Sequence, residues 1–223
     1  MIVLGVDTVG ATAGVALLGP RGLAASRELG ERGRHAEALV PAVLDLLHDS
    51  AVSWDGLGLL AVNEGPGSFT GLRVGISFVL GVADARSLPA VGVSCLDILA
   101  WACYDATGPE TGTYVVGASD VRRGEVALAR FRVGPEGPAR EGGDTLIAVR
   151  DAGEPPPAGS AVAGDGAHLL WPEATGLLRW PGTGGERALA TARLGLRGYV
   201  SGRREPPAPR YARPPEARPR RPV

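Results

Sequence analysis

The chain has 223 residues, 44% of them apolar and 21% charged, which is enough for one large domain or two small ones with a hydrophobic core. Its 24 acidic residues nearly balance its 23 basic ones. This balance argues against a chain-wide field that would hold a nucleic acid or an anionic membrane, so any such partner must be met locally. Every basic residue is an arginine, and the lack of lysine excludes a Walker A phosphate loop and Schiff-base chemistry.

Two cysteines, Cys95 and Cys103, lie eight residues apart within one predicted helix. A single pair at this spacing neither crosslinks a secreted fold nor forms a zinc site, so we expect buried free thiols. The first residues lack a basic leader segment, and the longest apolar run, at 74–83, is too short to span a bilayer. These features predict a cytoplasmic protein with no membrane partner.

The first half of the sequence alternates short apolar segments with amphipathic ones, a pattern typical of α/β proteins. Three strands joined by short turns are expected at 2–6, at 12–18 and in a segment that ends near Leu29. Apolar residues at helical spacing predict a helix at 34–48, which Pro41 should bend because it lacks a backbone donor. The other elements expected here are a strand at 57–62, a helix at 68–86, a strand at 90–93 and a helix at 94–104.

The opening pattern recurs in the second half of the chain. Residues 3–17 and residues 115–128 both consist of an apolar strand that ends in an aspartate, a turn, and a second strand that starts at a glycine. We therefore expect a duplicated α/β architecture, with a first subdomain at 1–108 and a second, smaller one at 109–202.

The second subdomain is weakly patterned, and a tail follows it. Residues 134–160 are interpreted as a Gly- and Pro-rich loop, and residues 187–199 as one late helix. Residues 203–223 contain seven prolines and seven arginines against two acids, which predicts an extended, positively charged tail. The tail is either a packing or solubilising arm, which we favour, or an arm that contacts RNA.

The most informative stretch is Gly65–Gly75, GPGSFTGLRVG, which follows a predicted strand and runs into a predicted helix. Gly67, Gly71 and Gly75 are spaced by four residues and so share one face of that helix. Because a helical glycine costs about 1 kcal/mol relative to alanine, this bare face needs a compensating close contact. The contact is either a second helix, from residues 34–48 or from a partner, or packing within the chain.

The sequence contains few of the residue patterns that are typical of catalytic sites. The histidines at 35, 48 and 168 form no His-x-x-x-His or His-Glu-x-x-His pair that would hold a metal. No Gly-x-Ser-x-Gly elbow is present, and Ser68 stands where a helix cap is expected. Ser94 and Asp97 have the spacing of a capping box at the next helix. A metalloprotease or a serine hydrolase is therefore disfavoured.

Three aspartates, Asp7, Asp120 and Asp165, each end a short predicted strand. Actin-like and sugar-kinase-like folds place acids at this position toward a magnesium nucleotide, but a strand-end aspartate is also a common turn former. The residues alone leave both interpretations open. Any nucleotide site is expected to be weak and to involve Asp7, Thr8 and Asp120.

Together these residues resemble the TsaB family, also called YeaZ. The GPGSFTGLRVG stretch is the most specific signature, and the supporting segments follow the family order along nearly the whole chain. These segments are Asp7-Thr8, residues 34–41, 92–94, 120–126, 164–166 and 209–217. The resemblance implies an α/β protein with the duplicated actin-like, Hsp70-like (ASKHA) fold, made of two mixed-sheet subdomains of which the second is reduced.

The resemblance also implies a non-catalytic subunit rather than an enzyme. Members of the family assist a metal-bearing paralogue, TsaD, which transfers a threonylcarbamoyl group to an adenosine beside the tRNA anticodon, and an ATPase, TsaE, completes the bacterial machinery. The implied partners are a TsaD-like paralogue, a TsaE-like ATPase, a second copy when the chain is alone, and tRNA through the complex. No cofactor or metal of its own is implied, and ATP or ADP at the partner interface stays open.

The implied partner surface lies on the first two predicted helices. The interface residues expected there are His35, Leu39, Gly67, Phe69, Thr70, Gly71, Arg73 and Gly75. The chain departs from the family after Asp7, where Thr-Ser-Thr is typical and Thr8-Val9-Gly10-Ala11 stands here, which weakens the expectation of independent nucleotide binding. The alternatives are an actin-fold small-molecule kinase or ATPase and, with least support, a glycoprotease-like peptidase.

Overall fold

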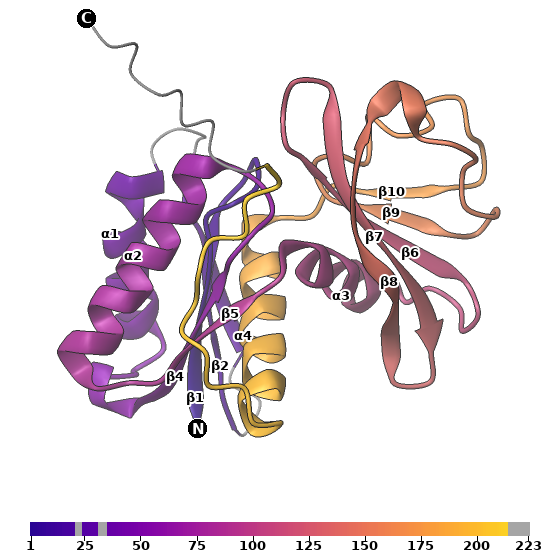
Figure 1. The fold of residues 1–223 in the computed structure, drawn as a ribbon. Helices are drawn as coiled ribbons and strands as arrows, with labels where there is room; N and C mark the ends of the chain where they lie inside the picture. The colour runs from indigo at the N-terminus through magenta and orange to yellow at the C-terminus, as the bar shows by residue number, and fades with distance from the viewer. Residues whose placement is uncertain (21–23, 31–34, 214–223) are drawn as a thin grey trace, which may run out of the picture.

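The computed structural model contains two five-stranded mixed sheets with helices on their faces (Figure 1). It describes residues 1–20, 24–30 and 35–213, so the predictions for Arg34 and for 214–223 lie outside the described residues. The first sheet has the order β3-β2-β1-β4-β5. Its strands are β1 (Ile2–Asp7), β2 (Gly14–Leu18), β3 (Ala24–Glu28), β4 (Leu57–Asn63) and β5 (Ala90–Val93).

The second sheet repeats the arrangement of the first. Its order is β10-β9-β6-β7-β8. Strand β6 pairs antiparallel with β7 and parallel with β9, just as β1 pairs antiparallel with β2 and parallel with β4. The strands are β6 (Tyr114–Asp120), β7 (Glu125–Gly134), β8 (Gly137–Ala148), β9 (Ala161–Ala163) and β10 (Leu178–Trp180). The predicted duplication is therefore present in the strand topology.

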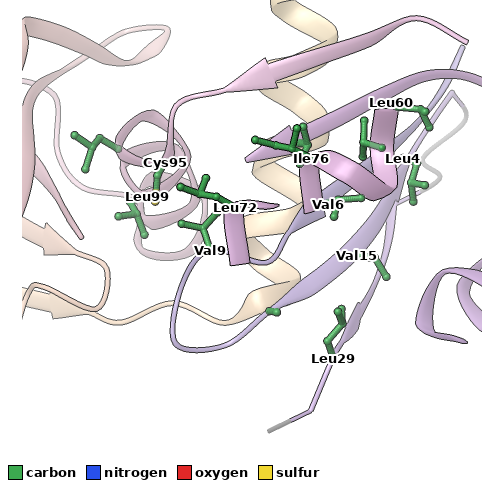
Figure 2. Packing of buried hydrophobic residues seen from close by; sticks show 14 of the residues in the cluster. Leu4, Val6, Val9, Val15, Leu29, Leu60, Leu72, Ile76, Cys95 and Leu99 are labelled. Carbon is green, nitrogen blue, oxygen red and sulfur yellow. The ribbon is translucent and has the colours of Figure 1, made fainter. Parts of the chain in front are cut away.

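Helices cover both faces of the first sheet. Helices α1 (His35–Asp49) and α2 (Phe69–Arg86) lie side by side on one face, and α4 (Gly184–Val200) lies on the other (Figure 1). The alternation of the strands explains this arrangement, because successive side chains point to opposite faces. Leu4 belongs to the cluster under α1 and α2, whereas Val3 belongs to the cluster that contains Ala192 of α4. Figure 2 shows Ile76 and Leu72 of α2 among the first of these clusters.

The helices that cover the sheets are exchanged between the two halves of the chain. Helix α3 (Cys95–Thr107) follows β5 of the first sheet but packs on the second, and α4 follows β10 of the second sheet but packs on the first. Gly5 and Gly117 occupy matching positions in β1 and β6. A Cβ on Gly5 would overlap the Ala188 carbonyl of α4, and one on Gly117 would lie 2.5 Å from the Leu96 carbonyl of α3. Each central strand thus lies directly under the helix supplied by the other half.

Most expected elements are present, with three differences. The loop predicted at 134–160 is wrong over 137–148, which form the twelve-residue strand β8, whereas 152–160 contain no helix or strand. Strand β10 was not expected, and neither were the short 3₁₀ helices at Trp54–Gly56 and Val149–Asp151. Pro41 lies inside α1, and Ser68 caps α2 by accepting a hydrogen bond from the Gly71 N–H at 3.2 Å.

The capping box predicted at the start of α3 is also wrong. Ser94 is the N-cap residue but makes no side-chain cap bond. Asp97 instead accepts two hydrogen bonds from Arg140 of β8, at 3.2 and 2.8 Å, and Ser94 Oγ lies 3.4 Å from the same guanidinium. A tertiary ion pair has replaced the local cap.

None of the helices in the described ranges is long and apolar enough to cross a membrane.

Candidate functional site

Asp7, the acid that ends β1, lies fully buried at the turn into β2. Its Oδ1 accepts a hydrogen bond from the Val9 backbone N–H at 2.9 Å, and its Oδ2 accepts from Asn63 Nδ2 and Arg187 Nε, each at 3.1 Å. The side chains of Asp7 and Arg187 are 0% and 2% exposed. Both carboxylate oxygens are therefore engaged by groups of this chain.

Arg187 belongs to α4, and its guanidinium lies inside the turn between β1 and β2. It also donates to the Thr12 carbonyl, and a Cβ on Gly10 would lie 2.5 Å from its Nη2. Burial alone would lower the Arg187 pKa, but the negative charge of Asp7 opposes this effect and the pKa is raised, so the cation persists. An internal ion pair thus occupies the turn for which the sequence left a magnesium-nucleotide site open as one of two interpretations.

Thr8 and the glycines of α2 pack against each other. Thr8 Oγ1 donates to the Gly71 carbonyl at 2.7 Å. A Cβ on Gly71 would overlap the Thr8 carbonyl, one on Gly75 would lie 2.5 Å from Thr8 Oγ1, and one on Gly67 would overlap Val9. The interpretation of this face as open to a second helix is wrong, because the β1–β2 turn of the same chain fills it.

Asp120 faces a cavity, unlike Asp7 and Thr8. The cavity of about 210 Å³ is lined by Val9, Gly67, Ser68, Phe69, Thr70, Asp120, Val121, Arg122 and Asp165. The Asp120 carboxylate accepts hydrogen bonds from the Arg122 N–H at 2.8 Å and from Arg122 Nη1 at 3.0 Å, and the Asp120 N–H donates to Asp165 Oδ1 at 2.9 Å. The structure therefore separates a sealed Asp7 from a partly open Asp120 instead of combining them around one ligand.

Within the described residues, no group of three or more His, Cys, Asp or Glu side chains could hold a metal ion. The two cysteines are buried free thiols, as expected. Burial raises the pKa of Cys95 to about 12, with a further contribution from the Asp7 charge, and burial raises the pKa of Cys103 to about 11. Neutral, buried thiols are poor nucleophiles and poor metal ligands.

The residues expected at a partner interface divide by exposure. Phe69, Thr70 and Arg73 are exposed at the start of α2. His35, Leu39, Gly71 and Gly75 are buried inside the molecule, and Gly67 is half-buried. The buried residues shape the two helices from inside the molecule.

The sequence analysis missed several exposed apolar residues on the same two helices. Val40 and Leu44 of α1 are 47% and 48% exposed, and Leu80 of α2 is 38% exposed. A cavity of about 460 Å³ also lies on α2, lined by Trp54, Ser77, Phe78, Gly81, Val82, Ala85 and Arg86. We call the outer surface of α1 and α2 the docking face, and define it by the exposed residues Val40, Leu44, Phe69, Thr70, Arg73, Leu80 and Gly81 and the half-buried Phe78. The spacing of Val40 and Leu44, one turn apart and off the core stripe, is the signal that could have found it.

The described part of the tail packs on the molecule and borders the docking face. The Tyr211 and Phe69 ring centroids are 5.2 Å apart, Arg73 lies 3.9 Å above the Phe69 ring, and Arg73 Nε donates to Tyr211 Oη at 3.3 Å. Arg210 pairs with Glu64 at 2.7 Å, and Arg213 Nε pairs with Glu125 of β7 at 2.6 Å. Up to residue 213 the tail is thus a packing arm that joins both halves of the molecule.

The chain is similar in sequence to a family model and to several known proteins. A family model described as tRNA N6-adenosine threonylcarbamoyltransferase (TsaD) matches residues 31–189. The tRNA threonylcarbamoyladenosine biosynthesis protein TsaB of Escherichia coli is 37% identical over 132 residues, which are 59% of this chain and 55% of the relative. TsaB of Bacillus subtilis is 32% identical over 132 residues, 59% of this chain and 56% of the relative. The chain therefore spans just over half the length of the curated relatives that it matches.

Solved structures are similar to this chain over a longer part of its length. YeaZ from Pseudomonas aeruginosa superposes with a TM-score of 0.79 at 28% identity and covers 94% of this chain and 99% of its own. A ROK family glucokinase from Streptomyces griseus, 11% identical with a TM-score of 0.50 over 89% of this chain and 100% of its own, shares the fold alone. The expected duplicated actin-like fold is confirmed. The matched family model and these relatives show that the chain belongs to the TsaB (YeaZ) family, within the wider family of TsaD.

Proposed function

We propose that this chain is the non-catalytic subunit that binds and activates a TsaD-like enzyme in the synthesis of threonylcarbamoyladenosine in tRNA. The observation that carries the proposal is the docking face. Val40, Leu44 and Phe69 are each about half exposed on the neighbouring helices α1 and α2, α2 also borders a cavity, and exposed apolar surfaces of this kind mark protein interfaces. The names of the TsaB relatives supply the pathway.

The sealed state of Asp7 supports a non-catalytic role. A magnesium nucleotide would need carboxylate oxygens that Asp7 already gives to Arg187, Asn63 and a backbone N–H. Releasing them would leave the buried Arg187 without its counter-charge, which is costly. In this proposal the chemistry takes place on the TsaD-like partner, a TsaE-like ATPase supplies ATP hydrolysis, and any ATP or ADP binds where this chain meets its partner.

Light scattering behind a sizing column tests the proposal, with the chain alone and mixed with a TsaD paralogue from the same source. We expect a homodimer from the chain alone and a mixed complex with the paralogue. The substitutions Leu44→Glu and Gly81→Arg should abolish both, since each places a charge on the docking face. Neither should disturb the fold, because Leu44 is exposed and a side chain at Gly81 meets no atom within 4 Å.

Leu146→Glu is the matched control. Leu146 of β8 is 40% exposed but lies on the second sheet, away from α1 and α2. It should leave both complexes intact. The proposal fails if the unaltered chain forms no mixed species at micromolar concentration with or without ATP and the ATPase, or if Leu44→Glu binds as tightly as Leu146→Glu.

A further inference from the structure

A groove lies where α3, α4 and β8 meet, on a part of the molecule that the docking face does not use. Its cavity of about 790 Å³ is bounded by residues of these elements and by the tail. Four arginines line it, at 140, 197, 203 and 210, against two acids, Asp97 and Asp144. The groove is thus locally basic in a chain of net charge −1.

Two of these arginines are already neutralised. Arg140 holds Asp97 through two hydrogen bonds and pairs with Asp144 as well, so the two carboxylates more than offset its charge and fix its position between α3 and β8. Arg210 pairs with Glu64 at 2.7 Å. These two arginines shape the wall of the groove and contribute little free charge.

Arg197 and Arg203 carry the free charge of the groove. Arg197 lies over Trp101, with its guanidinium carbon 5.3 Å from the ring centroid. Such a cation–π contact leaves the N–H groups of the guanidinium able to donate hydrogen bonds to a ligand. Arg203 donates one bond, from Nη1 to the Gly92 carbonyl at 2.8 Å. Among the described residues, neither arginine forms an ion pair with a carboxylate.

The opposite side of the groove has room for a ligand. Gly142 and Gly143 of β8 line it, and a Cβ on either would meet no atom within 4 Å. Helix α4 lies on the face of the first sheet opposite α1 and α2 (Figure 1). A partner that binds the docking face therefore leaves the groove accessible.

We propose that this groove binds the phosphodiester backbone of RNA through Arg197 and Arg203. Guanidinium edges bind phosphate oxygens with paired, charge-assisted hydrogen bonds, and such contacts supply most of the affinity of basic surfaces for nucleic acid. The choice of RNA over an acidic protein segment rests on the proposed function, which places a tRNA on the same complex. The site goes beyond that function because it gives the non-catalytic subunit a direct contact with the substrate.

Fluorescence anisotropy with labelled tRNA tests the inference, using the full chain with and without its TsaD partner over a range of salt concentrations. The double substitution Arg197→Ala, Arg203→Ala should weaken tRNA binding about tenfold. The plot of log K against log salt concentration has a negative slope, and the variant should make this slope less steep by about two. Each phosphate that the variant no longer binds accounts for about one. Gly143→Asp should weaken binding in the same direction, and it keeps the test valid if loss of the Arg203 bond to Gly92 disturbs the fold.

Arg193→Ala is the matched control, since Arg193 is exposed on the same helix one turn away but pairs with Asp105 outside the groove. It should leave affinity and salt slope unchanged. Unchanged tRNA binding by both groove variants would overturn the inference. So would binding of polyglutamate, but not tRNA, that the groove variants abolish, because the groove would then serve an acidic protein segment.

The same samples separate this inference from the proposed function. If the chain forms the complex with TsaD and the groove variants bind tRNA normally, the inference fails and the proposed function stands. If the chain binds tRNA through the groove but forms no complex with TsaD, the proposed function fails and the groove assignment stands.

Discussion

The glycines of α2 are of two kinds, those packed tightly against the chain and those with open space around them. A Cβ on Gly71 would overlap the Thr8 carbonyl, whereas a Cβ on Gly81 meets nothing within 4 Å. Gly71→Ala should therefore destabilise the protein by about 1–3 kcal/mol through overpacking, and Gly81→Ala should stabilise it by about 0.5–1 kcal/mol through helix propensity. Urea unfolding measures both. Equal effects of the two substitutions would contradict the internal packing of the glycine face.

The buried pair of Asp7 and Arg187 gives a second prediction at this scale. Arg187→Ala leaves the Asp7 carboxylate buried without a counter-charge and should cost about 3–5 kcal/mol of unfolding free energy. Arg193→Ala removes a surface ion pair and should cost less than about 1 kcal/mol. In a double-mutant cycle, the variant that carries both Asp7→Asn and Arg187→Ala should recover part of the unfolding free energy lost in Arg187→Ala. Additive effects of the Asp7 and Arg187 substitutions would show that the pair is not coupled.

The two buried thiols should make the stability of the fold depend on pH. The Cys95 and Cys103 pKa values of about 12 and 11 lie above the ordinary 9.0, so the folded state keeps both protons where the unfolded state loses them. The thiols should not affect stability below pH 9, and stability should fall from pH 9 up to the folded pKa values, about 11 for Cys103 and about 12 for Cys95. Cys→Ser variants should lack this effect. At pH 8 a thiol reagent should label neither cysteine in the folded chain and both in denaturant. Rapid labelling of the folded chain would contradict their burial.

The sequence located the important residues better than it assigned their contacts. Asp7, Thr8 and the glycines at 67, 71 and 75 are recognisable from their spacing, and the structure does bring Thr8 and these glycines together. Which surface the glycines meet depends on a turn more than 50 residues away, which helical periodicity does not encode. Arg187 was missed because its partner, Asp7, is 180 residues distant and nothing in the local sequence marks it.

At the scale of elements, the strands missed by the sequence analysis are both at sheet edges. Strand β8 is largely exposed and contains Gly142-Gly143, so it lacks the alternation that reveals a half-buried strand. Strand β10 has three residues and is held by its pairing with β9. The central strands of both sheets were predictable because their burial leaves an uninterrupted apolar signal. Tertiary pairing, rather than local preference, creates the edges.

Tyr211 in the tail should influence the docking face. Tyr211 contacts both Phe69 and Arg73, so Tyr211→Ala should loosen these side chains and weaken binding of the proposed TsaD-like partner about fivefold or more. Tyr211→Phe keeps the ring contact and removes only the hydrogen bond, so it should weaken binding less. Titration by calorimetry measures both. Equal affinities of the Ala and Phe variants would show that the ring contact does not support the face.

For the whole molecule, the exchange of α3 and α4 means that neither half is complete alone. A fragment of residues 1–108 lacks α4, which leaves Val3, Leu59, Ala61 and Val91 of the first sheet uncovered. We expect this fragment to show no cooperative thermal transition by circular dichroism, since burial of such surface drives folding. Mixing it with residues 109–223 should restore one. A cooperative transition in the fragment alone would show that the sequence boundary at 108 separates independent folding units.

The exchange of helices also bears on how the chain folds as it is made. Domains generally fold from the N-terminus during synthesis, at about 5–20 residues per second. Here β1 and β4 emerge early, but the helix that covers one of their faces emerges only with residues 184–200, roughly 6–30 s later at that rate. Throughout that interval the nascent chain carries a sheet with a bare apolar face. A chaperone at the ribosome should therefore engage this protein late into its translation.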